Sequence, residues 1–529
     1  MLKYSLDHLI INNGHLFGYG WSFFSENPII SLRLRLELVS LENIEIDGEF
    51  GRQRTDVSTA FPSVAEAENA GFMLLAGIPH TPIKQAYLLW QFQDGQEIQI
   101  QIQLPENGVE VKVDRISHYR ALFFKAIALQ RSSGYKILFK KVWRYLSLYP
   151  KIMDEQGWEQ LHLRVKSAQV VVIIDHDMGG GANLYRRERV SEYLREDLKV
   201  VLLGYHVASL QYFIEIYDQQ GSKRVAVNTM SALLELVRYS KVEHIVYNCA
   251  VSFRTPLEVV GLLIALQKAS QANLLVAVHD FFIACPSHFL LNNQGNYCGV
   301  PNIEQCRNCL KSHRDGFVSM TAVNSIDIWR QEWARLLAIA NEVRFFSNST
   351  KEVMKRAYPA LSTATWTIVP HKLHTTVTAV NTVAGTCMHI GVVGAIGKHK
   401  GSHIIQDIVA FIKSMNLNVK ITIIGTLEAK ASAEFVTITG PYEPRQLPSL
   451  IEQTGANVFL FPSISAETFS YVSHELVAMG VPFACFNFGA PADLARVYSR
   501  GMVLTSMQAA DILKDLDTLW RKSYLIEDK

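Results

Sequence analysis

The stretch TGANVFLFPSISAETFSYVSHELVAMGVPFACFNF, residues 454–488, decides the fold of this chain. A buried strand over 458–461 leads through a Pro-Ser exit loop into a helix with an apolar face, and a second strand follows over 483–488. Glu467 comes near the carboxyl end of the first strand, and Glu475 lies about two helical turns further on. Because ligands bind at the carboxyl ends of strands in open α/β sheets, the pattern predicts an α/β fold with both carboxylates in a ligand site.

The spacing of the two carboxylates indicates what kind of ligand they would hold. If the chain from Glu467 to Glu475 is helical, it rises about 12 Å, more than the roughly 5–9.5 Å between paired glycosidase carboxyls. The pair would then grip two parts of one long ligand, with an anion near the amides of Thr468, Phe469 and Ser470 at the helix N-terminus. A nucleotide diphosphate sugar has this layout. The alternative, two solvated glutamates on a surface helix, is disfavoured by the flanking strand-loop-helix pattern.

The composition narrows the class of protein. A chain of 529 residues with 49% hydrophobic and 19% charged side chains favours a globular protein of about two to four domains. A net charge of +2 gives no global attraction to nucleic acid, and seven cysteines do not indicate a secreted disulfide scaffold. We see no signal peptide and no apolar run of about 18 residues. A cytoplasmic location is therefore expected.

Residues 1–110 are expected to form a small β-sandwich. Apolar and polar residues alternate over 31–39 and 97–104, as in strands with one buried face. Aromatic and arginine side chains of this region, such as Trp21 and Arg54, either line a sugar-binding face or belong to the core. We favour the core.

Residues 111–165 form a basic, aromatic segment. Between 120 and 151 there are eight Lys or Arg residues, no Asp or Glu, and seven interleaved aromatic residues. A helix of this composition fits an anionic membrane surface at the inner membrane face. A linker helix packed between domains is slightly favoured over membrane contact, and nucleic acid is the least favoured partner.

From residue 166 onward, strands alternate with helices in two halves of similar size. The predicted strands are 170–175, 200–204, 244–248 and 274–279 in the first half, and 388–393, 419–424, 458–461 and 483–488 in the second. The pattern predicts two Rossmann-like domains, 166–365 and 366–529, joined by a hinge near Pro370 and facing a cleft.

A glycine-rich loop follows the first strand of each half. In the second half, Gly394, Gly397 and Gly401 accompany Lys400, so the backbone could approach a phosphate while the cation adds a charge-assisted contact. The spacing differs from the dinucleotide fingerprint. In the first half, Gly180 and Gly181 belong to a run of three glycines, which favours close approach to a ligand over a flexible turn.

The dipeptide His279-Asp280 ends a predicted strand of the first half. A histidine at the carboxyl edge of a parallel sheet is better placed for chemistry than for the core, although a buried core histidine is the usual alternative. We expect His279 to face the cleft.

Together these motifs resemble those of the retaining glycosyltransferases of family four, which have the GT-B fold. The resemblance covers roughly residues 168–525. The matching residues are Gly179–Gly181, His279-Asp280, Ser347 with Pro370, the Gly394–Gly401 loop with Lys400, Gly440-Pro441-Tyr442, and Glu467 with Glu475.

The resemblance implies transfer of a sugar from a nucleotide diphosphate donor to an acceptor, with retention of anomeric configuration and without a required metal. The basic, aromatic segment and the extra β domain favour a glycan or lipid-linked acceptor at the membrane face. Cell-surface polysaccharide synthesis is the favoured role. The resemblance further implies that Glu475 holds the ribose, Glu467 contacts the donor sugar, and Lys400 neutralises the diphosphate. His279 would bind the transferring sugar, and residues 440–442 would lie against the base.

Two departures from the family pattern concern the donor site. Many members carry an Arg where this chain has Ala395, so the phosphate site would rest more on Lys400, with Lys398 as a second candidate, and on backbone amides. Loss of that cation would weaken donor binding by about 1–3 kcal/mol. The second departure is His371, followed by Lys372, where an Asn-Gly or His-Gly pair is common.

A cluster of four cysteines follows His279-Asp280. Cys285, Cys298, Cys306 and Cys309 have the spacing C-x12-C-x7-C-x2-C, and the last pair has the spacing of a zinc knuckle. The sequence leaves open a structural zinc site with four thiolates, four reduced thiols, or disulfides.

Two other functions are compatible with parts of this sequence. A GT-B sugar-nucleotide epimerase would need a different set of carboxylates and histidines. A carbohydrate-binding or scaffold protein would use the β-sandwich and a degenerate transferase half, which the presence of Lys400, Glu467, Glu475 and His279 disfavours.

Overall fold

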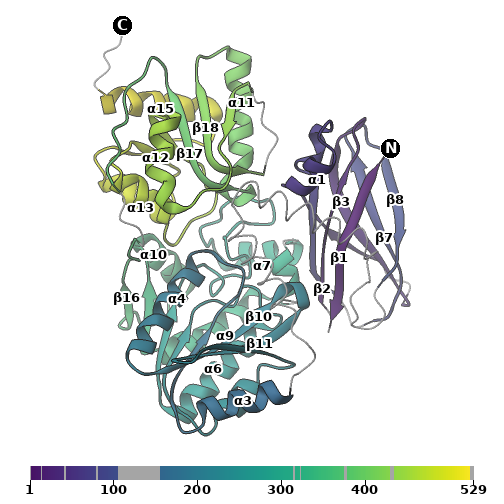
Figure 1. The fold of residues 1–529 in the computed structure, drawn as a ribbon, viewed down its shortest axis with the longest axis vertical. Helices are drawn as coiled ribbons and strands as arrows, with labels where there is room; N and C mark the ends of the chain where they lie inside the picture. The colour runs from purple at the N-terminus through teal and green to yellow at the C-terminus, as the bar shows by residue number, and fades with distance from the viewer. Residues whose placement is uncertain are drawn as a thin grey trace. The chain divides into compact units, whose positions relative to one another are not determined.

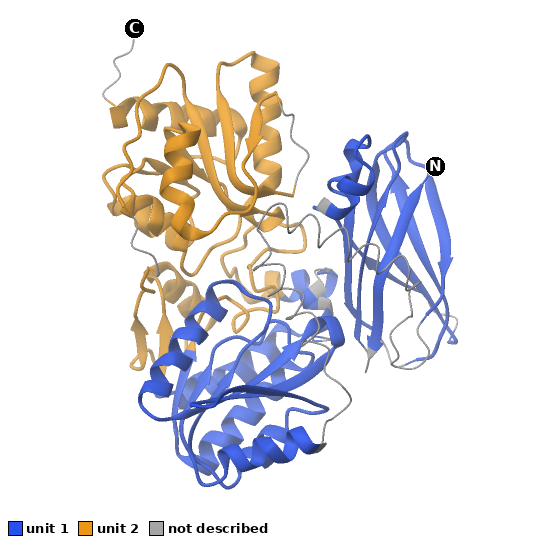
Figure 2. Cartoon of the chain, viewed as in Figure 1, with its two compact units in different colours: residues 1–276, 307–341 blue, residues 277–306, 342–529 orange. Residues whose placement is uncertain are grey.

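The computed structural model describes residues 2–12, 15–40, 43–78, 81–104, 155–313, 316–321, 323, 325–373, 378–428 and 434–524. The predicted basic, aromatic segment lies outside the described residues except for helix α3 (Glu155–Val165), so its three interpretations stay predictions. Contacts divide the chain into two compact units, shown in Figure 2. Unit 1 comprises Met1–Val276 and Arg307–Asn341, and unit 2 comprises Ala277–Cys306 and Glu342–Lys529.

The N-terminal part of unit 1 is a β-sandwich, as predicted. Its strands are β1 (Lys3–Asn12), β2 (His15–Phe23), β3 (Ile29–Leu38), β4 (Asn43–Asp47), β5 (Glu49–Arg52), β6 (Gly71–Gly77), β7 (Ile83–Phe92) and β8 (Glu97–Ile102). They form two four-stranded sheets in the orders β1-β2-β6-β5 and β4-β3-β7-β8. Alternate residues such as Leu34, Leu74 and Trp90 fill one shared core.

The aromatic and arginine residues singled out in this domain are structural. Trp21 and Phe61 pack with ring centroids 5.8 Å apart, in a small apolar cluster with Phe23. Arg54 is buried and pairs with Asp7 at 2.8 Å and Asp56 at 2.6 Å. The core interpretation is supported for these side chains.

The second part of unit 1 is a Rossmann-like α/β domain (Figure 1). Its strands are β9 (Gln169–Ile174), β10 (Lys199–His206), β11 (Gln211–Asp218), β12 (Gly221–Val227), β13 (Lys241–Tyr247) and β14 (Asn273–Ala277), in the order β12-β11-β10-β9-β13-β14. Its helices include α4 (Gly180–Arg195), α5 (Ala232–Val237), α6 (Pro256–Ser270), α8 (Gly316–Met320) and α9 (Ile326–Ile339). Strands β10, β9, β13 and β14 pair in parallel, whereas β10, β11 and β12 pair antiparallel.

Unit 2 contains the second Rossmann-like domain. Its parallel sheet has the order β19-β18-β17-β20-β21-β22. These strands are β17 (His389–Ile396), β18 (Lys420–Leu427), β19 (Val436–Ile438), β20 (Val458–Phe461), β21 (Phe483–Cys485) and β22 (Gly501–Val503). The helices are α10 (Asn348–Ala357), α11 (Ser402–Met415), α12 (Leu447–Thr454), α13 (Tyr471–Ala478), α14 (Gly489–Val497) and α15 (Ala509–Tyr524), and a short parallel pair, β15 (Glu342–Phe345) and β16 (Trp366–Ile368), belongs to the same unit.

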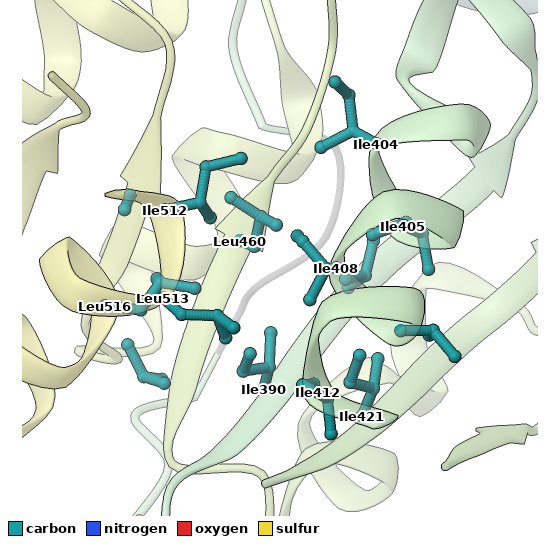
Figure 3. Packing of buried hydrophobic residues seen from close by; sticks show 14 of the residues in the cluster. Ile390, Ile404, Ile405, Ile408, Ile412, Ile421, Leu460, Ile512, Leu513 and Leu516 are labelled. Carbon is teal, nitrogen blue, oxygen red and sulfur yellow. The ribbon is translucent and has the colours of Figure 1, made fainter. Parts of the chain in front are cut away.

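Helices cover both faces of the six-stranded sheet because alternate strand residues point to opposite sides. On one face, Ile390 and Leu460 pack with isoleucines of α11 and with apolar residues of α15 (Figure 3). On the other face, Phe459 and Phe461 pack with residues of α12, α13 and α14. This arrangement confirms the predicted fold class, in which two Rossmann-like domains follow an all-β domain.

The boundary between the predicted α/β domains differs from the observed division. Residues 277–306 and 342–365, which the sequence assigned to the first α/β domain, group with unit 2. His279 and three of the four clustered cysteines therefore belong to the same compact unit as Lys400 and Glu467. In the described part of the chain, no helix is both long and apolar enough to cross a membrane.

Candidate active site

A tight turn follows strand β17 and presents Lys400. The 3-10 helix η3 (Lys398–Lys400) ends at Gly401, which has φ +80° and whose added Cβ would lie 2.0 Å from the Pro462 carbonyl oxygen. Only glycine combines this backbone conformation with so close an approach. The His399 carbonyl accepts a hydrogen bond from the Ile464 N–H at 3.1 Å. The turn is therefore fastened to the loop that follows β20.

The loop after β20 is longer than the sequence predicted. Helix α13 begins at Tyr471, because the Ser470 side chain caps it by accepting a hydrogen bond from the Ser473 N–H at 3.3 Å. Glu467 lies in the preceding loop and not in the helix. The predicted helical rise of about 12 Å between Glu467 and Glu475 was therefore wrong, since it assumed a continuous helix.

Lys400 and Glu467 are brought together in unit 2. Lys400 Nζ lies 3.6 Å from Glu467 Oε1, and the two side chains are 35% and 18% exposed. Glu467 Oε1 itself is buried, and it has no hydrogen-bond partner in the described part of the chain. A buried carboxylate oxygen without a hydrogen bond is costly, so this one is poised to accept a hydrogen bond from a ligand.

The backbone around Glu467 is held by Gly489, a residue that the sequence analysis missed. A Cβ on Gly489 would lie 2.7 Å from the Glu467 N atom, and its φ is +74°. The Glu467 carbonyl accepts a hydrogen bond from the Ala490 N–H at 2.8 Å. A glycine directly after the strand at 483–488 was the available signal.

Thr468 connects this loop to His279. Its hydroxyl donates to the His279 carbonyl at 2.6 Å, and its own carbonyl accepts from the hydroxyl of the fully buried Thr350 at 3.3 Å. The His279 ring stacks on Phe346 at 4.5 Å and lies 5.4 Å from the His371 ring. The structure thus places His279 beside the loop that carries Glu467.

Glu475 is buried in the second turn of α13. Burial raises the pKa of its carboxyl to about 7. Burial also raises the pKa of the Tyr442 phenol, and the nearby Glu475 carboxylate raises it further. These two predicted donor-binding residues are therefore close enough to interact electrostatically.

The raised pKa of Glu475 predicts how pH changes stability. In the unfolded chain this carboxyl titrates near 4.5, so between about pH 4.5 and 7 the folded protein binds the extra proton and stability falls as pH rises. Replacing Glu475 by glutamine should raise the free energy of unfolding at pH 8 by up to about 3 kcal/mol, and by almost nothing at pH 4.

Urea unfolding at both pH values checks this expectation. Glu452→Gln is the matched control, because Glu452 is exposed on α12 in the same unit. Equal effects of Glu475→Gln at pH 8 and pH 4 would show that the carboxyl titrates normally.

The remaining predicted donor-binding residues of unit 2 lie at or after the carboxyl ends of strands β17, β19 and β20. Gly394 has φ +120°, and a Cβ on Gly397 would lie 2.7 Å from the Glu428 carboxylate. The Gly440 N–H donates to the Gly425 carbonyl at 3.0 Å. Phe469 stacks on His474 with centroids 4.1 Å apart.

In unit 1, Gly180 and Gly181 open helix α4 and are exposed. A buried polar network that the sequence analysis missed holds this loop. Asp175 Oδ2 accepts from Asn183 Nδ2 and from Arg186 Nη1, each at 2.8 Å, while Asn183 Oδ1 accepts from the Gly179 N–H at 2.6 Å. Arg186 is therefore structural.

The four clustered cysteines are reduced in the structure, as are the other three. Among the described residues, no group of three or more His, Cys, Asp or Glu side chains has the arrangement of a metal site. The zinc site gains no support from the geometry and stays a prediction.

One protein family and several solved structures are similar to parts of this chain. No curated protein sequence matches the chain. HepE from Anabaena, solved with UDP-glucose, aligns with a TM-score of 0.40 and 12% identity over 68% of this chain and 94% of its own. The pneumococcal O-GlcNAc transferase GtfA, solved with UDP and GlcNAc, aligns with a TM-score of 0.36 and 9% identity over 68% and 95%.

Residues 381–527 match the family described as Glycosyl transferases group 1. This range contains Lys400, Glu467 and Glu475 together with the whole six-stranded sheet. The match to this family therefore covers the second Rossmann-like domain.

Proposed function

We propose that the chain is a retaining glycosyltransferase. It moves a sugar from a nucleotide diphosphate donor to a glycan or lipid-linked acceptor, in cell-surface polysaccharide synthesis. One observation carries the proposal: within the domain that matches the group 1 glycosyltransferase family, Lys400 Nζ lies 3.6 Å from a Glu467 carboxylate oxygen that is buried and has no hydrogen-bond partner in the described part of the chain. A cation next to a carboxylate acceptor suits a phosphate and a sugar hydroxyl side by side.

The departing diphosphate is the group that needs stabilisation in such a transfer. In this proposal, the Lys400 ammonium neutralises the charge that develops as the bond to the sugar breaks. The N–H groups at the start of α13, where Ser470 is the cap, add a partial positive charge that also favours the diphosphate. Gly394 leaves room for a phosphate to approach the backbone, since an added Cβ there would meet no atom closer than 4.0 Å.

The sugar and the nucleoside would bind on either side of the diphosphate. Glu467 Oε1 accepts a sugar hydroxyl, and His279, held by Thr468, hydrogen-bonds the transferring sugar. Glu475 accepts the two ribose hydroxyls, and Tyr442 lies against the base. We propose no role for a divalent metal in the transfer, so turnover should persist in EDTA.

Removing Glu475 should weaken donor binding. Glu475→Ala loses two charge-assisted hydrogen bonds to the ribose, so the donor Kd should rise by about tenfold to a hundredfold, or roughly 1–3 kcal/mol. Calorimetric titration with the nucleoside diphosphate checks this, with Glu452→Ala as the matched control on the exposed face of α12. An unchanged Kd would exclude the ribose role.

Donor binding should also depend on pH through the same carboxyl. Because burial raises the pKa of Glu475 to about 7, acidification converts the acceptor into a neutral acid, and donor affinity should fall as pH drops from 8 to 6. Glu475→Gln should bind more weakly but with no pH dependence in this range. A wild-type affinity that stays constant over the range would contradict this account.

A panel of UDP-, GDP- and dTDP-sugars tests the proposed function itself. We expect at least one donor to raise the melting temperature and to be hydrolysed slowly without acceptor, with the first-formed sugar keeping its anomeric configuration by proton NMR. No response to any donor would favour a carbohydrate-binding or scaffold protein. Release of an inverted sugar would contradict the retaining mechanism.

A further inference from the structure

The segment Phe281–Val300, which carries Cys285 and Cys298, is folded on itself within unit 2. The Phe281 N–H donates to the His288 carbonyl at 3.1 Å, and the Cys298 N–H donates to the Leu290 carbonyl at 2.9 Å. Leu291 and Tyr297 form an antiparallel bridge. These backbone hydrogen bonds give the segment a defined shape.

This segment packs on elements of the second Rossmann-like domain and its neighbours in unit 2. The Tyr358 hydroxyl donates to the Ile283 carbonyl at 2.6 Å, and Arg356 Nε donates to the Gly299 carbonyl at 2.9 Å. Tyr297 packs on Phe488 with ring centroids 4.7 Å apart, and burial raises its pKa to about 12. Leu291 contacts the core cluster of the six-stranded sheet.

One contact of the segment reaches the Lys398–Gly401 turn. The Phe289 ring lies flat on the His399 ring, with centroids 4.2 Å apart and planes inclined by 7°. Burial lowers the pKa of the His399 imidazole to about 3, with further lowering by the Lys400 and His288 charges. His399 therefore stays neutral at physiological pH and adds no charge beside Lys400.

His399 in turn holds the two loops of the candidate active site together. Its carbonyl accepts the Ile464 N–H at 3.1 Å and the hydroxyls of Ser463 and Ser465 at 3.4 and 3.3 Å. Lys400 is the next residue, and the loop that begins at Pro462 leads to Glu467. A side chain that fixes His399 thus fixes the spacing between Lys400 and Glu467.

We propose that Phe289 is a positioning residue for Lys400, and that the Phe281–Val300 segment holds the diphosphate-binding turn of the donor site in place. The effect of this role on catalysis rests on the proposed function. The positioning itself does not depend on that function, since it acts through a stacked ring and hydrogen bonds within unit 2. For the cysteines of this segment, the sequence alone left open a structural zinc site, reduced thiols or disulfides.

Hydrogen exchange without any ligand tests the positioning. In Phe289→Ala, amides of the 397–402 and 462–467 loops should exchange about two- to tenfold faster, the range that one aromatic pair accounts for. Phe289→Tyr keeps the stacked ring and should exchange like wild type. Gln294→Ala, at the exposed tip of the same segment, is the matched control. Unchanged exchange in both loops of Phe289→Ala would overturn the proposal.

The titration of His399 is the second readout. In Phe289→Ala, water reaches the imidazole, so its pKa should rise toward the ordinary value of 6.5, as followed by NMR and assigned with His399→Gln. If Phe289→Ala does not fold, Phe289→Leu, which keeps the volume without the ring, replaces it in both measurements. A His399 pKa that stays near 3 in the folded variant would also overturn the proposal.

Donor measurements then separate this proposal from the proposed function. With UDP, GDP and dTDP as probes of binding and the donor sugar selected by the panel as substrate, Phe289→Ala should raise the Kd and lower kcat by about two- to tenfold, whereas Phe289→Tyr should restore both. If wild type binds none of the three, the proposed function fails while the exchange and titration results still decide the positioning. If wild type binds one and Phe289→Ala binds it equally well with equal kcat, the positioning role fails alone.

Discussion

Replacing Lys400 by alanine is expected to lower kcat by about 10²–10³, the cost of removing one preorganised electrostatic contact to a developing charge. The Lys400 ammonium lies 3.6 Å from Glu467 and is about one-third exposed, so it is open to a diphosphate. Because residue 395 is an alanine, no cation at that position of the glycine-rich loop compensates for the loss. Steady-state kinetics with the donor selected by the panel measures the effect.

Two further variants separate local charge from net charge. Lys413→Ala removes an exposed lysine from the last turn of α11, in the same unit, and should change kcat by less than about twofold. Lys400→Arg keeps the charge and should retain more activity than Lys400→Ala. If Lys413→Ala and Lys400→Ala had equal effects, the specific role of Lys400 would be excluded.

Replacing Gly401 by alanine is expected to lower the free energy of unfolding by about 3–5 kcal/mol, since it combines a left-handed backbone with an overlap in a packed loop. The new Cβ would lie 2.0 Å from the Pro462 carbonyl oxygen, which is backbone and cannot rotate away. If the protein folds, the loops must separate, and a shift of about 1 Å at Lys400 can lower kcat a hundredfold.

Gly455→Ala is the matched control for this backbone effect. Gly455 ends α12 with φ +68°, close to the +80° of Gly401, but its added Cβ would meet no atom within 4 Å. Gly455→Ala should therefore lower the free energy of unfolding only by the strain of the left-handed backbone, about 1–2 kcal/mol. It should leave kcat unchanged. Urea unfolding and kinetics of both variants measure the difference. Equal losses of unfolding free energy would show that the close approach to Pro462 does not affect stability.

The parallel sheet of unit 2 was predictable because its strands are short runs of buried residues between helices. Val458–Phe461 is apolar at all four positions, and the structure has strand β20 at these residues. The hairpin β11–β12 was missed in unit 1. Its strands carry Glu215 and Arg224, which pair at 2.7 Å, so charges interrupt the pattern that marks a buried strand.

The residues of the candidate site were predictable only where they belong to a local sequence motif. Lys400, Glu467 and Glu475 stand in recognisable local patterns, but the start of α13 was placed four residues early because Ser470 as a cap cannot be told from a helical serine. The contacts of Thr350, Gly489 and Phe289 join segments far apart in the sequence. No local pattern reports such contacts.

The same limit applies to the pKa values of the site. The sequence shows that Glu475 is a glutamate, but its raised pKa depends on burial by the surrounding helix and sheet. Residues 277–306 show the limit at the level of domains, since chain order placed them in the first α/β half and contacts group them with the second.

Calorimetric titration of UDP-glucose, GDP-mannose and dTDP-glucose into wild type, Lys400→Ala and Glu475→Ala tests the central claim most directly. We expect wild type to bind at least one of these sugars with 1:1 stoichiometry, and both variants to bind it at least about tenfold more weakly, since each loses a charge-assisted contact. Equal affinity in all three proteins would contradict the account, because the nucleotide sugar would then bind without the lysine and the glutamate that define the proposed donor site.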